Sequence, residues 1–323
     1  MKATTMHLTR RRYLVALSAT ALPTLGHAQA EPAALQRPLA AKSVCLDLTR
    51  AGERLVAVGE RGHVLLSDDQ GKTWRQAKKV PTRTTLTAVH ATDARTLWAV
   101  GHGGAILRSG DAGESWTRVH GKIDGTDTLL AVRVEPDGHG LAVGGFGFAL
   151  RTQDGGVKWE RAELLPGEVG ERHLNRIFVS ARSTWLIAAE NGAVLRSEDR
   201  GAHWQLVATP YQGSLWSGQA LADGVLLACG MRGNLVRSSD DGRTWKHQAI
   251  PEAGSLTAIA LRGDQRPVVV GVDGILLSGN LAGDQFAFKR LNDRANLTGA
   301  LVLSSGDLLA TSTAGLRVIQ LPA

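Results

Sequence analysis

Apolar and polar residues alternate in short runs along most of the chain, and the segment from residue 86 to 120 shows this pattern clearly. Its first run, Leu86–His90, reads Leu-Thr-Ala-Val-His, the alternation expected of a half-buried strand. Further apolar runs cover Leu97–Val100, then Ala105–Arg108 after a glycine-rich turn, and finally Trp116–Val119. The segment therefore predicts four short strands, and no stretch after residue 30 has a convincing helical period.

Two phrases repeat along the chain. The first is Ser-Asp-Asp-Gln-Gly-Lys-Thr-Trp at 67–74; it recurs at 109–116, 152–159, 197–204 and 238–245, with a degenerate copy at 278–286. Its closing aromatic residues lie at positions 74, 116, 159, 204, 245 and 286, so the repeat is 41 to 45 residues long. The second phrase is a glycine followed by an apolar run, and it occurs at Gly62, Gly104, Gly147, Gly192, Gly233, Gly274 and Gly315.

Seven copies of a four-strand unit predict an all-β fold, a seven-bladed β-propeller. The expected blades are approximately 43–81, 85–121, 128–163, 173–208, 214–250, 255–290 and 297–321. The last unit offers only three strands before the chain ends. We therefore expect residues 32–41 to add an N-terminal strand to the seventh blade and to close the ring.

The first phrase has two interpretations, an active site or a turn that every blade needs. Its serine or threonine and its aspartate can bind nearby backbone N–H groups, its glycine allows a positive φ, and its tryptophan offers a large apolar face. A catalytic acid is needed once or twice in an enzyme, so five full copies favour the structural interpretation. The residues given this structural role are Ser67, Asp69, Gly71, Trp74, Ser109, Asp111, Gly113, Trp116, Asp154, Gly156, Trp159, Ser197, Asp199, Gly201, Trp204, Ser238, Asp240, Gly242 and Trp245.

The first 30 residues have the features of an export signal. A basic start precedes an apolar run from Tyr13 to Leu25, and Ala28-Gln29-Ala30 fits the small-residue pattern of a signal-peptidase site. Residues 9–14, Thr-Arg-Arg-Arg-Tyr-Leu, resemble the twin-arginine motif, while an ordinary Sec signal is the alternative. We predict a signal peptide at 1–30, a mature domain at 31–323 and a periplasmic location.

Removing this segment changes the charge of the protein. The signal carries four of the 37 basic residues and no acidic residue, so the mature chain has 37 − 4 = 33 basic residues against 30 acidic ones. A net charge near +3 without a dense basic run argues against nucleic-acid binding. Cys45 and Cys229 each fall in a predicted strand, and we expect two buried, unpaired thiols.

The repeated phrase resembles the Asp box, or BNR repeat, of sialidases and their relatives. Seven blades, the glycine phrase before each Asp box and a cleavable leader together resemble the photosystem II stability/assembly factor family. That resemblance covers nearly the whole mature chain, and bacterial members are often labelled glycosyl hydrolase-like. It implies a non-enzymatic propeller that binds a protein partner.

A carbohydrate-active enzyme on the same fold is the alternative. A sialidase needs a tyrosine nucleophile, an arginine trio and acidic groups, but the mature chain has a single tyrosine, Tyr211, and lacks the Arg-Ile-Pro signature. The acids Glu163, Glu168 and Glu171 fall in one loop. Neither histidine spacing nor the Asp pairs match a metal site. We therefore predict no catalytic residue, no metal site and no cofactor.

The turns between the second and third strands of each blade lie on one face of a propeller, opposite the Asp boxes. Polar and aromatic residues on such loops suit recognition. We expect this face to bind a protein partner, a membrane or exported protein, while the propeller itself is a monomer. The predicted binding residues are Arg61, His63, His102, Phe146, Phe148, Glu190, Asn191, Met231, Arg232 and Asp273.

Overall fold

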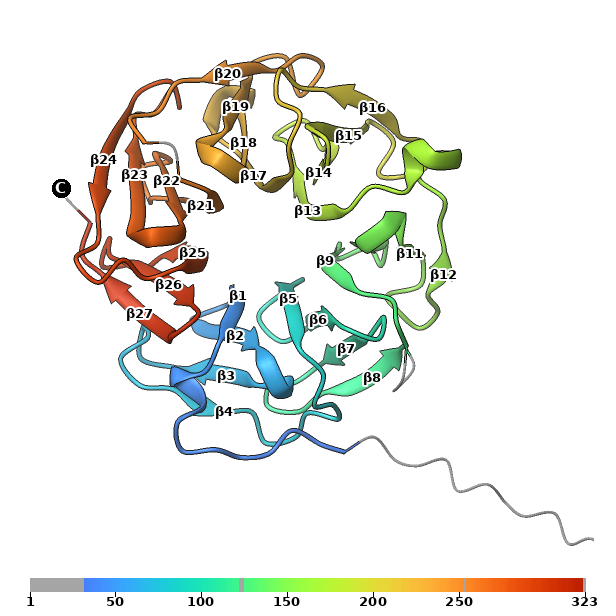
Figure 1. Cartoon of the computed structure of the whole chain (residues 1–323). Coiled ribbons are helices and arrows are strands. Elements are labelled where there is room, and N and C mark those ends of the chain that lie inside the picture. The colour runs from blue at the N-terminus through green and yellow to red at the C-terminus, as the bar shows by residue number, and fades with distance from the viewer. Residues whose placement is uncertain (1–31, 122–124, 253, 322–323) are drawn as a thin grey trace, which may run out of the picture. The chain divides into compact units, whose positions relative to one another are not determined.

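A computed structural model describes residues 32–121, 125–252 and 254–321. The predicted signal peptide, 1–30, lies outside these residues, so its assignment and the export route stay predictions. Within the described part, seven antiparallel sheets follow one another around a central axis (Figure 1). The prediction of an all-β, seven-bladed propeller is confirmed, and no described helix is long and apolar enough to cross a membrane.

Within the described residues, six blades have four strands and the seventh has three. The strands of blades 1 to 4 are β1 (Cys45–Ala51), β2 (Arg54–Gly59), β3 (Val64–Ser67), β4 (Arg75–Gln76); β5 (Leu86–Ala91), β6 (Leu97–Gly101), β7 (Ile106–Ser109), β8 (Thr117–His120); β9 (Leu129–Val134), β10 (Gly140–Gly144), β11 (Ala149–Thr152), β12 (Glu160–Arg161); and β13 (Leu174–Val179), β14 (Trp185–Ala189), β15 (Ala193–Ser197), β16 (Gln205–Ala208). Those of blades 5 to 7 are β17 (Leu215–Ala220), β18 (Leu226–Gly230), β19 (Leu235–Ser238), β20 (Lys246–Gln248); β21 (Leu256–Leu261), β22 (Pro267–Gly271), β23 (Ile275–Gly279), β24 (Phe286–Arg290); and β25 (Leu297–Val302), β26 (Leu308–Ser312), β27 (Gly315–Ile319).

Short 3-10 turns are the described helical elements. They are η1 (Ala40–Lys42), η2 (Glu60–Gly62), η3 (Gly145–Gly147), η4 (Gly167–Gly170), η5 (Ala222–Gly224), η6 (Met231–Gly233) and η7 (Val272–Gly274). Turns between the second and third strands lie at the end where each innermost strand begins, because Cys45 pairs with Gly59. We call this end the loop face and the opposite end, which carries the Asp-box turns, the Asp-box face.

Aromatic residues fill the junctions between blades. Trp116, 2% exposed, packs in one cluster with Val56 and Leu66 of the preceding blade. Replacing a fully buried tryptophan by alanine typically costs about 3–5 kcal/mol of folding free energy, because a cavity remains. The equivalent residues in the other junctions are Trp74, Trp159, Trp204, Trp245 and Phe286.

Each Asp-box turn is held by its own side chains. The Ser109 hydroxyl accepts a hydrogen bond from the Gly113 N–H at 2.9 Å and donates to Asp111 at 2.8 Å. Asp111 also accepts from the Ser115 N–H at 2.9 Å, and the Trp116 indole N–H donates to the Gly113 carbonyl oxygen at 2.9 Å. The bonds from backbone N–H groups to the Ser or Thr hydroxyl and to the Asp carboxylate also occur in the turns that begin at residues 67, 152, 197 and 238. The indole bond recurs at Trp74 and Trp204. Within the turn, these backbone N–H groups have no partner strand, and the carboxylates accept their hydrogen bonds instead.

The ring closes through side chains that join the first and seventh blades. The Thr298 hydroxyl on β25 donates to the Cys45 carbonyl oxygen on β1 at 2.6 Å. Leu55 of the first blade and Leu309 of the seventh belong to one buried cluster. Closure therefore uses the same kind of contact that joins the other neighbouring blades.

The prediction that residues 32–41 supply a fourth strand to the seventh blade is wrong. This segment forms no strand. Its first part runs along the outside of the first blade, where the Ala34 N–H donates to the Val80 carbonyl oxygen at 2.9 Å, and its end, in η1, lies against β27 of the seventh blade. Pro32 and Pro38 have no N–H to offer, so a continuous ladder with β27 is disfavoured.

Both cysteines are buried and unpaired, as predicted. They belong to different blades, Cys45 on β1 and Cys229 on β18. Burial raises the pKa of Cys45 to about 12 and also raises the pKa of Cys229. Neither thiol is therefore ionised at neutral pH, and both act as small core residues.

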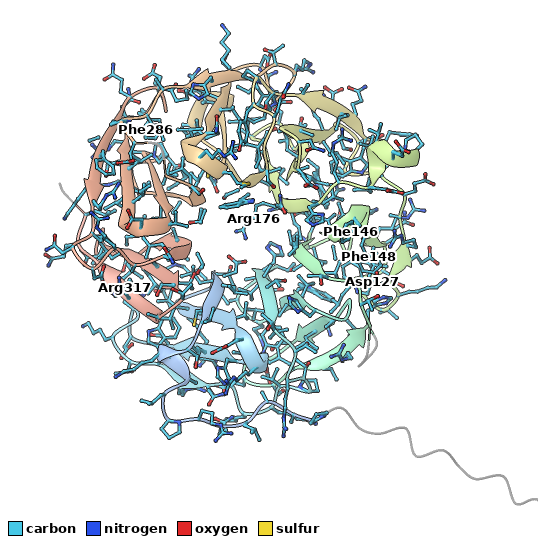
Figure 2. All side chains as sticks on the ribbon, in the orientation of Figure 1. Asp127, Phe146, Phe148, Arg176, Phe286 and Arg317 are labelled. Carbon is cyan, nitrogen blue, oxygen red and sulfur yellow. The ribbon has the colours of Figure 1, made fainter. Side chains whose placement is uncertain are left out.

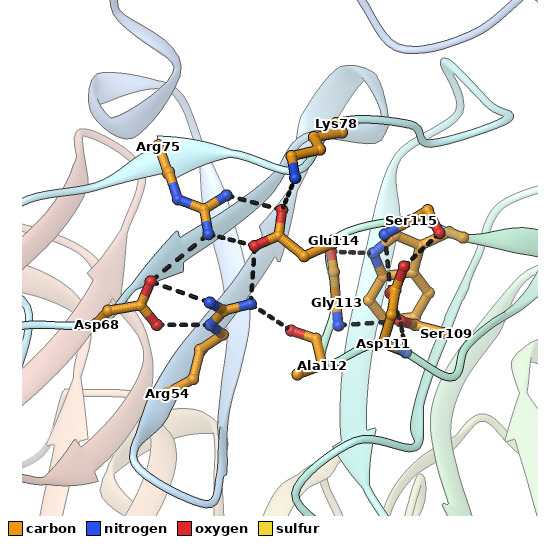
Figure 3. A network of polar contacts seen from close by, with 11 residues as sticks. Arg54, Asp68, Arg75, Lys78, Ser109, Asp111, Ala112, Gly113, Glu114 and Ser115 are labelled. Carbon is orange, nitrogen blue, oxygen red and sulfur yellow. Dashed lines mark hydrogen bonds and ion pairs between the residues drawn. The ribbon is translucent and has the colours of Figure 1, made fainter.

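A charged network joins the first two blades on the Asp-box face (Figure 3). Arg54 contacts Asp68 at 2.6 Å and Glu114 at 3.0 Å, and Glu114 also pairs with Arg75 and, at 3.7 Å, with Lys78. The hydrogen bond from Arg75 is the main reason that the pKa of Glu114 is lowered. Several partly exposed charges acting together hold this junction better than one surface pair would.

The Asp-box turns predict a specific dependence of stability on pH. The backbone N–H of His203 is the main cause that lowers the pKa of Asp199 from an ordinary 3.8 to about 2, and hydrogen bonds from Ser197 and the His203 ring also lower it. A folded-state pKa below the unfolded value means that this stabilisation is complete above pH 4 and is lost as the pH falls toward 2.

For Asp199→Asn, we expect the free energy of unfolding to fall less steeply between pH 4 and pH 2 than it does in the wild type. The slope should differ by the equivalent of up to one bound proton, because the variant has no carboxylate to protonate at this position. Urea unfolding at several pH values measures the two slopes. Asn280 accepts the Asp284 N–H at 3.1 Å in the degenerate sixth turn, which shows that an amide can serve as the acceptor there. Identical slopes for the wild type and the variant would contradict the prediction.

Candidate functional site

The loop-face turns of blades 1 to 6 place two successive residues at positive φ. At the first of these positions φ lies between 52° and 71°, and a glycine with positive φ follows. This is the geometry of a type I′ turn, which favours glycine or asparagine because a Cβ atom is strained there. The residues at the first position are Arg61, Gly103, Phe146, Asn191, Arg232 and Asp273.

Phe146 is the unusual member of this set. A bulky aromatic residue at φ 52° is a backbone outlier, and such residues cost about 1–3 kcal/mol. Its side chain is 77% exposed, so burial does not offset this cost. The ring stands edge-on to His173, with the centroids 4.6 Å apart, and the Phe146 N–H donates to His173 Nδ1 at 3.3 Å. The fold thus holds one large aromatic side chain open to solvent in a fixed position.

A pocket of about 440 Å³ lies beside this ring on the loop face. Phe148 forms part of its wall, and the Arg161 guanidinium lies 4.6 Å from the centre of the Phe148 ring. Figure 2 labels Asp127, Phe146 and Phe148, which come from adjoining parts of the third blade. We call this site the Phe146 pocket; its lining residues are Thr126, Asp127, Thr128, Leu130, Gly145, Phe146, Phe148, Arg161 and His173.

The predicted binding residues do not all reach the surface of the loop face. Arg61, His102, Phe146, Asn191 and Arg232 are exposed. Glu190, Met231 and Asp273 are partly exposed. Their binding roles stay predictions.

Two of the predicted residues are buried. His63 is 3% exposed because it directly follows the turn glycine Gly62 and leads into β3, and burial lowers its pKa. Its side chain is therefore not displayed on the loop face. Phe148, 9% exposed, shows only the part of its ring that lines the Phe146 pocket.

The sequence analysis missed a charged pair inside the ring. Arg176 on β13 of the fourth blade contacts Asp47 on β1 of the first blade at 3.0 Å, and Figure 2 shows Arg176 at the centre of the ring. Asp47 is 6% exposed and also accepts the Val89 N–H of the second blade at 3.0 Å. The two residues are 129 positions apart, and no local pattern in the sequence links them.

The groups considered for catalysis are not assembled into a sialidase-like site. Burial is the main cause that raises the pKa of Tyr211, whereas a nucleophile needs a lowered one. Glu163, Glu168 and Glu171 are exposed around η4. Among the described residues, no group of three or more His, Cys, Asp or Glu side chains is placed to hold a metal ion.

Comparisons with known proteins identify relatives of this architecture. The family model described as Photosynthesis system II assembly factor YCF48 matches residues 113–212. A structure of YCF48 bound to a D1 peptide is 18% identical, with a TM-score of 0.69 over 90% of this chain and 96% of that chain. YCF48 from Cyanidioschyzon merolae is 17% identical, with a TM-score of 0.66 over 87% of this chain and 97% of that chain.

A streptogramin B lyase is also similar. It is 11% identical, with a TM-score of 0.73 over 88% of this chain and 96% of that chain. At such identities, likeness to a solved structure shows the fold alone, and one fold hosts many functions. No curated protein sequence matches this chain. The family-model match and the seven-bladed architecture together confirm the predicted resemblance of this chain to the photosystem II assembly factor family.

Proposed function

We propose that this protein is an exported, non-enzymatic binding protein of the assembly-factor type. Its loop face recognises a segment of a membrane or exported protein, and the Phe146 pocket is the centre of that surface. The observation that carries the proposal is the exposed aromatic ring of Phe146, held at positive φ beside a pocket of about 440 Å³. The family-model match and the D1 peptide bound to a YCF48 relative support a protein ligand.

Strain at Phe146 supports a functional role for its side chain. Asn191, at the equivalent turn of the next blade, shows that a less strained residue fits this geometry. Residues in costly conformations cluster at functional sites, where the surrounding structure holds them in place. An exposed aromatic ring that lowers stability is best explained by what it contacts in a complex.

The chemistry of the pocket fits a peptide segment with an apolar anchor. Phe146 and Phe148 supply aromatic surface, and such rings are frequent energetic centres of protein interfaces. Thr126, Asp127 and Arg161 add polar groups at the same site. Backbone amides and carbonyls of a bound segment can pair with these groups while an apolar side chain enters the pocket.

The alternative is a carbohydrate-active enzyme or another activity of this fold, such as that of the lyase relative. Glycosidases commonly need two carboxylates about 5–10 Å apart. The lining of the two central cavities, within the described residues, includes the single carboxylate Asp47, which is paired with Arg176. This arrangement favours the binding role over glycoside hydrolysis.

The strain argument predicts that Phe146→Asn raises stability. Relief of the backbone strain should increase the free energy of unfolding by about 1 kcal/mol, since the exposed ring buries little surface. Urea unfolding of the purified propeller measures the change. The matched variant Asn191→Phe introduces a bulky residue at the equivalent turn and should lower stability by a similar amount. A destabilised Phe146→Asn protein would contradict the strain argument.

The binding proposal predicts that the same variant loses its partner. Crosslinking and pull-down from periplasmic and membrane fractions should recover a specific protein with the wild type and at least about tenfold less with Phe146→Asn, because a central interface aromatic contributes 2 kcal/mol or more. Lys246→Gln, an exposed change on the outer strand β20 away from the loop face, should retain the partner. If the wild-type protein recovers no partner and cleaves a member of a glycoside panel, the result would support a carbohydrate-active enzyme instead.

The export proposal predicts a specific requirement for arginine. Replacing Arg10 and Arg11 by lysine keeps the basic charge and removes the pair that the twin-arginine route reads. Cell fractionation should then find the precursor retained inside the cell, whereas the unchanged sequence reaches the periplasm. Normal export of the double-lysine variant would show that the leader uses the Sec route.

A further inference from the structure

The axis of the ring contains a cavity that the loop-face proposal does not use. It has a volume of about 170 Å³ and is lined by residues from the first five blades. Its charged or titratable side chains are Asp47, His90, Arg133 and Arg176, and Gln219 adds a carboxamide. A second cavity, nearer the loop face, shares Asp47 and Arg176, so this pair lies where the two spaces meet.

Arg176 already binds one carboxylate inside the ring. Its Nη1 donates to Asp47 Oδ2 at 3.0 Å, which is a guanidinium–carboxylate contact across the axis of the ring. Asp47 is fixed by the Val89 N–H as well, so the carboxylate is not free to follow Arg176. Nε and Nη2 of Arg176 donate to no other group within the described residues, and the side chain is 40% exposed.

Arg133 provides a second guanidinium on the wall of the same cavity. Its Nε donates to Glu135 Oε1 at 2.5 Å, which orients the group. Its two Nη groups have no recorded acceptor in the described part of the chain. Guanidinium groups bind carboxylates through paired N–H donors, so both arginines retain donors of the type that such a ligand needs.

Two arginine charges, those of Arg133 and Arg176, lie on the cavity wall. Each is matched by one carboxylate, Glu135 beside Arg133 and Asp47 beside Arg176. Burial is the main cause that lowers the pKa of His90 to about 4, and the positive charges of Arg133 and Arg176 contribute to this value. His90 is therefore neutral at pH 7, so the two guanidinium groups are the cationic donors on the cavity wall.

We propose that this axial cavity binds a small carboxylate, held by the unused guanidinium N–H groups of Arg133 and Arg176. The carboxylate would accept charge-assisted hydrogen bonds from the N–H groups that Glu135 and Asp47 leave unused. A volume of about 170 Å³ corresponds to roughly five or six water molecules, which suits a ligand between acetate and succinate in size. This site is separate from the Phe146 pocket and does not depend on the proposed protein partner.

Isothermal titration calorimetry of the mature propeller with acetate and with succinate, at constant ionic strength and pH 7, tests the proposal. Acetamide serves as the neutral probe. We expect at least one carboxylate to bind and acetamide to give no heat. Arg133→Gln should weaken binding at least about tenfold, because it removes charge-assisted hydrogen bonds while leaving the Asp47–Arg176 pair intact.

Arg176 needs a variant that does not leave a buried charge alone. The double variant Asp47→Asn with Arg176→Gln removes both charges together and should also weaken binding at least about tenfold. Lys246→Gln on the outer strand β20 removes one exposed positive charge and should bind like the wild type. Phe146→Asn should also bind normally, which separates this site from the loop face. Absence of carboxylate binding, or equal affinity in the wild type and Arg133→Gln, would overturn the proposal.

Discussion

Burial of apolar surface between neighbouring blades is the interaction on which the rest of this structure depends. A single four-stranded sheet cannot cover both of its faces, so each blade is stable only against the next. Trp116 shows how the contact is made, since it is 2% exposed and packs against Val56 of the preceding blade. The Asp-box turn serves this packing, because its hydrogen bonds fix the loop that ends in the tryptophan.

A closed ring of this kind allows the loop face and the axis to carry groups that would be costly elsewhere. Phe146 sits at positive φ on a turn whose two strands, β10 and β11, are firmly paired. Asp47 is nearly buried, and its charge is tolerated because Arg176 reaches it from the fourth blade. In both places the stable scaffold offsets a local cost, and such places are where binding is expected.

The sequence predicted the architecture well because its signals are local and repeated. The Asp-box phrase and the glycine phrase each report on a turn of a few residues, and their copies identify blades without any knowledge of contacts between them. The prediction failed for residues 32–41, where an extended segment was assigned to the seventh blade from its position in the chain. The segment contacts the outside of the first blade, as Ala34 does at Val80, and reaches the seventh blade only at η1, without adding a strand.

The sequence by itself determined the number of blades, the order of the strands and the positions of the turns, since these follow from hydrophobic alternation and turn chemistry within each repeat. It also placed Phe146 on the loop face. Only the tertiary structure decided which side chains meet inside the ring and which predicted residues stay exposed. Asp47 and Arg176 pair across 129 positions because closure of the ring brings the first and fourth blades to a common axis, and His63 is buried because of how its strand enters the blade.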